Sequence, residues 1–425
     1  MTILVLGLVG FSGIGQITYI VNVTDDTDDG VCDSNHCSFR EAIIKSRSDG
    51  MVSVVDFNIP GTGPHIIKPT NYSQIQLFGS DGDMINGLSQ PMNDPMNGQI
   101  VIENSFDNTY GDFRLSGANN WIIKGLEFRG TQTSKDLMVL IGSTNNIIEK
   151  NWFKGQFDNG IATVYQSNNS NTIKKNLIQG ANSDGIFLIT GTQNHLISQN
   201  SFLCNNGKAI HQSGNSNNNK IEPFITSVTS TTVSGTSEPN DNVEVFISEQ
   251  TSCNSTVLSQ GSTYIGVSKA NSGGIWQLNS FLNISGRDVL IATATSEENN
   301  TSEFSSPFIV LPDICDLAVL IPINNDPCST TGIVLDLKEL TDSGTSSTSS
   351  CVSSYQGNDA WLKVIVPTTG NFLIRQNLNN TVNAVIEAYS GDCNNLFLEQ
   401  CAEIDSVPHS MTFENFSVGS TVYLR

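Results

Sequence analysis

The sequence has few charged residues, and basic residues are the scarcer kind. Charged residues make up 14% of the 425 residues, and 20 Lys and Arg against 41 Asp and Glu give a net charge of −21. A surface this acidic repels nucleic acid and anionic lipid, and no basic stripe accompanies the aromatic residues. We therefore expect no nucleic-acid partner. Only residues 120–222 reverse the balance, with nine basic and six acidic residues.

Long hydrophobic runs are also missing. The apolar run Ile3–Phe11 is too short to span a bilayer, which needs about 20 apolar residues. It is followed by Ser12, Gly13, Gly15 and Gln16, so residues 1–16 read as part of a signal peptide. Since the first basic residue is Arg40, either the true start lies upstream or this segment is a short buried strand. We expect a secreted or cell-surface protein without a transmembrane span.

Helical periodicity and the common catalytic motifs are absent as well. Ala, Leu, Glu and Lys are scarce at a 3.6-residue period, which excludes a helical solenoid. The sequence contains no Gly-rich phosphate loop, no Ser-His-Asp signature and no His-x-x-x-His metal motif. Asn, Ser, Thr and Gly are abundant instead, and they favour turns and strands. The length predicts two or three domains, and we expect an all-β protein.

A repeat of about 25 residues is the strongest signal in the sequence. Similar segments close at Gly125, Asn151, Asn176 and Asn200, in steps of 26, 25 and 24 residues. One such unit cannot bury its apolar strands alone, whereas coils stacked about 4.8 Å apart bury a continuous core. The repeat predicts a right-handed parallel β-helix over residues 17–222. The recurrent Asn residues are expected to form hydrogen-bonded ladders between coils.

A helix is expected at the start of this solenoid. In Cys37-Ser38-Phe39-Arg40-Glu41-Ala42-Ile43, Ser38 and Glu41 form a capping box, which predicts a helix over residues 39–47. Such a helix would cover the open end of the first coil. The segment resembles the Cys-Ser-Leu-Arg-Glu-Ala motif at the start of many secreted bacterial β-helix proteins, with Phe39 in place of Leu. This resemblance, with the repeats, covers about residues 17–222 and implies the architecture, not an activity.

Two β-sandwich domains are expected after the repeats stop. Residues 223–311 contain short strands separated by turn signals and resemble the Ig-like modules of bacterial surface proteins. Residues 312–425 contain Asp359-Ala360-Trp361 and Val366-Pro367, which resemble the pre-peptidase C-terminal-like sandwich, a family of binding and accessory domains. Because the sequence stops within an expected strand, we expect this second sandwich to be truncated.

The nine cysteines favour an oxidising compartment. Cys32 lies close to Cys37, and Cys393 lies close to Cys401, without the spacing of a zinc site. We predict these two pairs as disulfides. Cys315, Cys328 and Cys351 are expected to contain at most one further bridge among themselves, and Cys204 and Cys253 are candidates for free thiols.

An acidic turn near the N-terminus is a candidate calcium site, the only cofactor we consider. Its residues are Asp25, Asp26, Asp28 and Asp29. The turn fails the EF-hand test, because the twelfth position, counted from Asp25, is His36 and not Glu. A different set of oxygen ligands and a solvated acidic turn remain as alternatives.

One face of the β-helix gathers the candidate catalytic residues. The phase of the repeat places Ala162, Phe187 and His211 in one outward column, with Asn159, Asp184 and Lys208 in another and Asp158 beside it. Two carboxylates on adjacent coils could serve a glycosidase, although Asp-Gly is also an ordinary corner. Our candidates are therefore Asp158, Asp184, Lys208 and His211 for catalysis, and Phe187 for ligand binding.

Binding is the function we favour from the sequence. We expect an adhesin-like protein that contacts polysaccharide or a cell-surface glycan through the β-helix face. The alternative is a polysaccharide lyase or glycoside hydrolase with its site on that face. A lyase would also need clustered basic residues to neutralise the substrate carboxylate. Lys208 is a single basic residue and supports a lyase only weakly. An enzyme should show convergent acidic and basic side chains, and a binding module a flat polar face.

Overall fold

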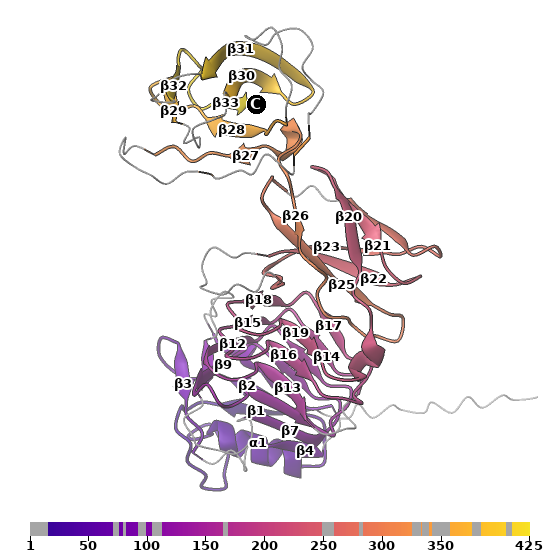
Figure 1. Ribbon diagram of the computed structural model, residues 1–425. Coiled ribbons are helices and arrows are strands. Elements are labelled where there is room, and N and C mark those ends of the chain that lie inside the picture. Colours follow the sequence, from indigo (N-terminus) through magenta and orange to yellow (C-terminus); the bar gives the residue numbers. More distant parts are fainter. Residues whose placement is uncertain are drawn as a thin grey trace, which may run out of the picture.

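The computed structural model shows a parallel β-helix followed by two β-sandwiches whose strands are mostly antiparallel (Figure 1). It describes residues 16–70, 76–79, 82–91, 99–103, 113–164, 169–248, 259–279, 284–324, 333, 340–341, 358–375, 384–404 and 410–425. The signal-peptide prediction falls almost wholly on residues 1–15, outside this set. Among the described residues, no helix is both long enough and apolar enough to cross a membrane.

Three parallel sheets form the β-helix, each receiving one short strand per coil. Their strands are, for sheet A, β1 (Ile17–Val21), β2 (Ser53–Phe57), β5 (Met84–Asn86), β8 (Ile122–Lys124), β11 (Ile147–Glu149), β14 (Thr172–Lys174) and β17 (Leu196–Ser198); for sheet B, β3 (His65–Ile67), β6 (Ile100–Glu103), β9 (Leu126–Thr131), β12 (Trp152–Gln156), β15 (Leu177–Gln179) and β18 (Ser201–Leu203); and for sheet C, β4 (Leu77–Gly79), β7 (Phe113–Ala118), β10 (Met138–Ile141), β13 (Ile161–Val164), β16 (Ile186–Leu188) and β19 (Ile210–Gln212). The register pairs 147–149 with 172–174 and these with 196–198, which confirms the repeat.

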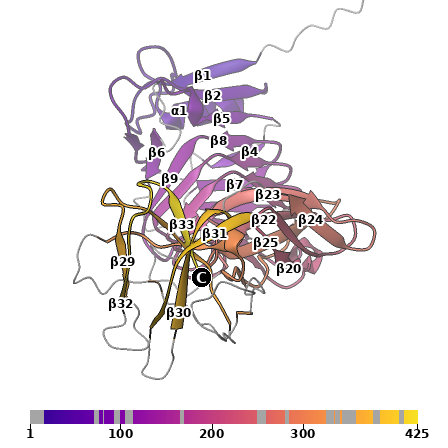
Figure 2. The same ribbon diagram turned by 90° about the horizontal axis from the view of Figure 1, so that it is seen from above.

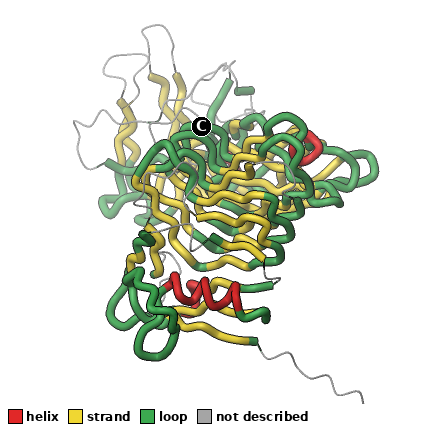
Figure 3. Tube along the Cα trace, turned by 90° about the horizontal axis from the view of Figure 1, so that it is seen from below, coloured by secondary structure: helices red, strands yellow, loops and turns green. Residues whose placement is uncertain are grey.

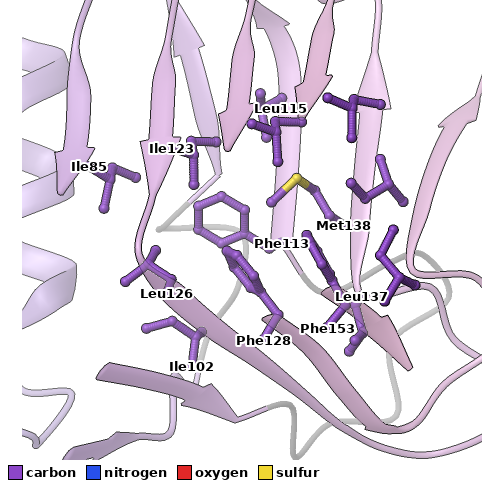
Figure 4. Packing of buried hydrophobic residues seen from close by; sticks show 14 of the residues in the cluster. Ile85, Ile102, Phe113, Leu115, Ile123, Leu126, Phe128, Leu137, Met138 and Phe153 are labelled. Carbon is purple, nitrogen blue, oxygen red and sulfur yellow. The ribbon is translucent and has the colours of Figure 1, made fainter. Parts of the chain in front are cut away.

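Aromatic and aliphatic side chains fill the inside of the coils. Phe128 lies 5.1 Å from Phe113 and 5.2 Å from Phe153, measured between ring centroids (Figure 4). All three rings are buried in one cluster that runs through the stack. Because alternate side chains of each strand point inward, equivalent residues of successive coils pack on each other.

Buried Asn ladders hold the corners between sheets A and B. Asn176 Oδ1 accepts from the backbone N–H of Asn151 at 2.9 Å, and its Nδ2 donates to Asn200 Oδ1 at 3.0 Å and to the carbonyl of Ile148 at 2.8 Å. The Asn residues of the repeat are therefore structural, as expected. The preceding residues, Lys150 and Lys175, have φ of 54° and 55°. This left-handed corner is costly for a side chain with a Cβ, so the ladder must offset it.

The helix α1 (Phe39–Ser48) closes the N-terminal end of the stack (Figure 3). Its capping box is present: Ser38 accepts from the N–H of Glu41 at 3.2 Å, and Glu41 accepts from the N–H of Ser38 at 2.8 Å. Phe39 stacks on Phe57 of the first coil with centroids 5.9 Å apart. The apolar side of α1 thus covers the core, which confirms the predicted capping helix.

The first sandwich follows the last coil and the short 3₁₀ turn η2 (Ser216–Asn219). Its two sheets contain β20 (Phe224–Val228), β21 (Thr232–Thr236) and β24 (Ile275–Asn279), and β23 (Thr263–Lys269), β22 (Asn242–Ile247), β25 (Val289–Thr295) and β26 (Phe308–Ile309). Trp276 is buried in the core between them.

This sandwich covers the C-terminal end of the β-helix, where the last coil has no successor (Figures 1 and 2). Side-chain oxygens of the sandwich accept hydrogen bonds from backbone N–H groups of the last coil, which a further coil would otherwise have accepted. The five pairs are Asn194 with Asn300 (2.8 Å), Ile197 with Thr301 (2.9 Å), Gln199 with Glu244 (2.9 Å), Asn205 with Gln260 (3.1 Å) and Gln212 with Glu303 (2.8 Å).

The second sandwich contains a five-stranded and a two-stranded sheet, preceded by the turn η3 (Cys315–Leu317). The strands are β27 (Val319–Leu320), β28 (Leu362–Ile365), β33 (Thr421–Leu424), β30 (Ala384–Asp392) and β31 (Asn395–Ile404), with β29 (Phe372–Arg375) and β32 (Ser410–Phe413). A buried Arg425–Asp359 ion pair joins its last residue to the segment before β28.

The disulfides correct part of the sequence prediction. Cys32 and Cys37 are bonded as predicted, but Cys393 is bonded to Cys315, 78 residues away, and not to Cys401. Cys401 and Cys204 are also disulfide-bonded, so Cys204 is not a free thiol. The prediction failed because it paired cysteines by closeness in sequence. In the structure, η3 is folded back against the hairpin β30–β31, and this brings Cys315 to Cys393.

Candidate functional site

The corner that leads into sheet C forms a ladder of short polar side chains. Asn159 donates its N–H to Asp136 Oδ1 at 3.1 Å, Asp184 donates its N–H to Asn159 Oδ1 at 3.0 Å, and Lys208 donates its N–H to Asp184 Oδ1 at 2.7 Å. The predicted column of residues 159, 184 and 208 is therefore present. Each side chain supports the backbone of the following coil, which is the ordinary corner role.

Asp136 begins this ladder, and sequence reasoning missed it. Burial raises the pKa of Asp136, and the charge of Asp158 raises it further, while hydrogen bonds from Asn159 and the charge of Lys135 act in the opposite direction. The 23-residue step from Asp136 to Asn159 is shorter than the 24 to 26 residues of the repeat. Counting back by one full repeat from Asn159 therefore does not reach Asp136.

A second column on sheet C brings an aromatic ring to the predicted acid and base. Phe187 is in register with Ala162 and His211, as expected. The Phe187 and His211 rings meet edge to face with centroids 5.2 Å apart. His211 Nδ1 lies 2.6 Å from Asp184 Oδ2. The structure thus joins three of the candidate residues, Phe187, His211 and Asp184, in one partly exposed group, the sheet C patch.

The other two catalytic candidates are engaged elsewhere. Asp158 accepts a hydrogen bond from the Ser183 hydroxyl of the next coil. Lys208 Nζ lies 2.5 Å from Glu303 Oε2 of the first sandwich. Sequence reasoning could not find Glu303, because it lies 95 residues beyond Lys208 in a different domain. The ion pair leaves Lys208 poorly suited to neutralise a substrate carboxylate.

The acidic side chains of residues 25–29 already form hydrogen bonds and an ion pair within the protein. Asp26 forms an ion pair with Arg40 and accepts from the Thr70 hydroxyl at 2.6 Å. Asp28 and Asp29 accept N–H groups two residues ahead, at 3.2 and 2.8 Å. Among the described residues, the group that could hold a metal is Asp29, His36 and Glu41, with ligand atoms within 4.8 Å of one another.

This group suits calcium poorly. Calcium prefers oxygen ligands, and His36 offers nitrogen. Both Glu41 oxygens already accept backbone N–H groups, from Asp29 and Ser38, each at 2.8 Å. A calcium site at this turn therefore stays a prediction.

His36 is expected to make stability depend on pH. Burial acts to lower its pKa, but the hydrogen bond and charge of Asp25 and the charges of Glu41 and Asp29 outweigh burial and raise it above 6.5. A raised pKa stabilises the folded state below the unfolded value and is lost as pH rises through the folded value. We expect the urea midpoint of the wild type to fall between pH 6 and pH 8 more than that of His36→Gln. If His36→Gln lowers the urea midpoint by the same amount at pH 6 and at pH 8, His36 contributes to stability only by packing.

Comparison with known proteins supports the fold of this region. Residues 96–224 match the family model of the right-handed β-helix region. No curated protein matches the chain. The matched residues include most coils of the three parallel sheets, and the coils before residue 96 continue the same sheets with the same register. The part of the chain that precedes the two sandwiches is therefore a parallel β-helix.

Proposed function

We propose that this chain is a secreted or cell-surface, adhesin-like binding protein that contacts glycan through the sheet C patch. The observation that carries the proposal is the partly exposed Phe187 ring beside the Asp184–His211 pair. An aromatic ring can pack against a sugar ring, and carboxylate and imidazole groups can bind its hydroxyls. The disulfides of the described residues support export, because such bonds persist in oxidising compartments.

The two sandwiches fit the same proposal. We assign residues 223–311 to an Ig-like module and residues 312–425 to a pre-peptidase C-terminal-like module, as the resemblances imply. Both regions consist of sheets packed around their own cores, and all their described strand pairs are antiparallel except β27–β28. In this proposal, they act as accessory modules that stabilise and present the β-helix, while residues 1–16 direct export.

The rival function is cleavage of polysaccharide on the same face. It is favoured by the 2.6 Å contact of Asp184 with His211, since a carboxylate that orients a histidine is a common feature of general-base sites. Against it, one Asp184 oxygen is occupied by the corner ladder, and Lys208 is paired with Glu303. The contacts thus favour binding.

A polysaccharide panel separates the two functions. Phe187→Ala is expected to weaken retention on a bound glycan roughly tenfold, because it removes the apolar surface for the sugar. Asp158→Asn and Asp184→Asn are expected to leave retention and thermal stability nearly unchanged, since Asn still accepts at the corner and its amide can still form a hydrogen bond with a sugar hydroxyl. Retention is measured by affinity electrophoresis, and reducing-end and unsaturated products are assayed in parallel. Phe397→Ala, an exposed ring on the second sandwich, is the matched control.

Two results would overturn the proposal. If Phe187→Ala binds as tightly as the wild type, the sheet C patch is not the contact surface. If the wild type cleaves a glycan and either Asn variant loses about 10²-fold or more in rate, the carboxylates are catalytic and the enzyme reading holds.

A further inference from the structure

The outer face of sheet B carries a continuous row of ion pairs across four coils. Lys68 Nζ lies 2.6 Å from Glu103 Oε1, and Arg129 Nη1 lies 3.7 Å from Glu103 Oε2. Arg129 Nη2 lies 2.5 Å from Glu127 Oε1, and Lys154 Nζ lies 3.7 Å from Glu127 Oε2. We call these five residues the sheet B ladder. They come from β6, β9 and β12 and from the residue that follows β3 (Figures 1 and 2).

The basic groups of the ladder are more exposed than the carboxylates with which they pair. The exposed side-chain fractions are 59% for Lys68, 32% for Arg129 and 26% for Lys154, against 15% for Glu103 and 6% for Glu127. Three cations against two carboxylates leave one net positive charge. The carboxylates hold the cations in place, so the surface that a ligand meets consists of N–H donors.

An aromatic side chain lies next to the ladder. Trp152 is in register with Glu127 on one side and Leu177 on the other, two residues from Lys154 on the same face of β12. It is partly exposed, whereas the other three tryptophans, Trp121, Trp276 and Trp361, are at most 1% exposed. A Trp ring on a surface gives an apolar plane with a polar edge.

We propose that the sheet B ladder and Trp152 bind an acidic polysaccharide. The cations meet its carboxylate or sulfate groups, and the Trp152 ring packs against a sugar ring. The coils repeat about every 4.8 Å, so the donors form a row along the helix axis that suits a linear polymer. In a chain with a net charge of −21, a set of at least partly exposed cations held by less exposed carboxylates lowers the repulsion that such a polymer meets. This site lies on a different sheet from the sheet C patch.

Trp152 makes the proposal directly measurable. Because the other tryptophans are buried, acrylamide quenching of the full chain reports mainly on Trp152. Polygalacturonate and a sulfated polysaccharide are expected to protect this fluorescence, while neutral dextran is not. Trp152→Phe should abolish the signal change, which assigns it. The protection should weaken as salt is raised, since exposed charges are screened.

Charge variants test the ladder without removing its centre. Lys68→Gln with Lys154→Gln removes two exposed cations and leaves Arg129 to hold both carboxylates. We expect the Kd for polygalacturonate to rise about tenfold or more. The matched control is Lys124→Gln with Lys174→Gln, the same charge change on sheet A, where Lys174 pairs with Glu149 at 3.3 Å. This control is expected to change the Kd by less than about twofold.

Each remaining outcome is decisive. Equal effects of the two double variants would mean that only net charge matters, and equal protection by polyglutamate would mean that the saccharide is not recognised; either result overturns the proposal. Phe187→Ala should leave the Trp152 protection unchanged. If Phe187→Ala loses glycan retention but keeps the Trp152 protection, the two sites are separate. The Trp152 measurement therefore tests the sheet B ladder independently of the sheet C patch.

Discussion

Asn176→Ala is expected to lower the free energy of unfolding of the β-helix by about 3 kcal/mol or more. The Asn176 side chain is 2% exposed. Its oxygen accepts from the backbone and side-chain nitrogens of Asn151 at 2.9 and 3.2 Å, and its nitrogen donates to Ile148 O and Asn200 Oδ1. Alanine would remove all four hydrogen bonds. Asn151 Nδ2 and Asn200 Oδ1 each keep another one, to Ile123 O and from the backbone N–H of residue 176, but the Asn151 N–H and the Ile148 carbonyl lose their Asn176 partner, and each unsatisfied buried group costs about 1–3 kcal/mol. Urea unfolding followed by circular dichroism measures the loss.

The control for this prediction lies in the same coil. Asn182 is exposed, and its backbone N–H binds the carbonyl of Phe157 whatever the side chain. Asn182→Ala should therefore change stability by no more than about 0.5 kcal/mol. If the two variants lose the same stability, the buried ladder contributes nothing beyond the loss of an Asn side chain, and the structural role given to the repeat Asn residues is wrong.

The β-helix could be predicted because its determinants repeat. Most coils have an inward aliphatic or aromatic residue and a corner Asn at equivalent positions, so the spacing of residues 125, 151, 176 and 200 predicts the register of the parallel strands. The same spacing placed Phe187 beside His211 and Asp184 beside Lys208. Parallel pairing between distant segments could therefore be predicted from the repeat length.

The features that sequence reasoning missed depend on contacts that occur once. Gln260 and Thr301 complete the last coil from another domain, 55 and 104 residues away from their partners. The Cys315–Cys393 bond spans 78 residues, and no local pattern distinguishes it from a bond to Cys401. These contacts depend on the tertiary structure of each domain. The spacing of residues in the sequence does not predict them.

The sheet B ladder shows a third kind of limit. Glu103, Arg129 and Lys154 stand at equivalent positions of successive coils, so the repeat does contain their alignment. The pairing of each carboxylate with two cations, however, becomes visible only when the strands are stacked, and the low exposure of Glu127 only when side chains are placed. The slight excess of basic residues over 120–222 includes only two of the three cations, Arg129 and Lys154, so composition alone did not indicate the ladder.

Gln260→Ala is expected to destabilise the last coil by about 2–3 kcal/mol, because the side chain replaces the next rung of a ladder. Gln260 is 4% exposed, and its oxygen accepts from the backbone and side-chain nitrogens of Asn205 at 3.1 and 2.9 Å. Its nitrogen donates to the carbonyls of Asn205 and Gly207.

Alanine at position 260 would remove the side-chain oxygen that accepts from the buried N–H of Asn205. Hydrogen exchange should then accelerate in β18 and much less in β9, which lies three coils away from β18 in sheet B. Lys208→Gln breaks the exposed ion pair with Glu303 at the same interface and should cost at most about 1 kcal/mol. If Gln260→Ala leaves exchange in β18 unchanged, the first sandwich does not act as a coil cap, and the solenoid is closed by other contacts.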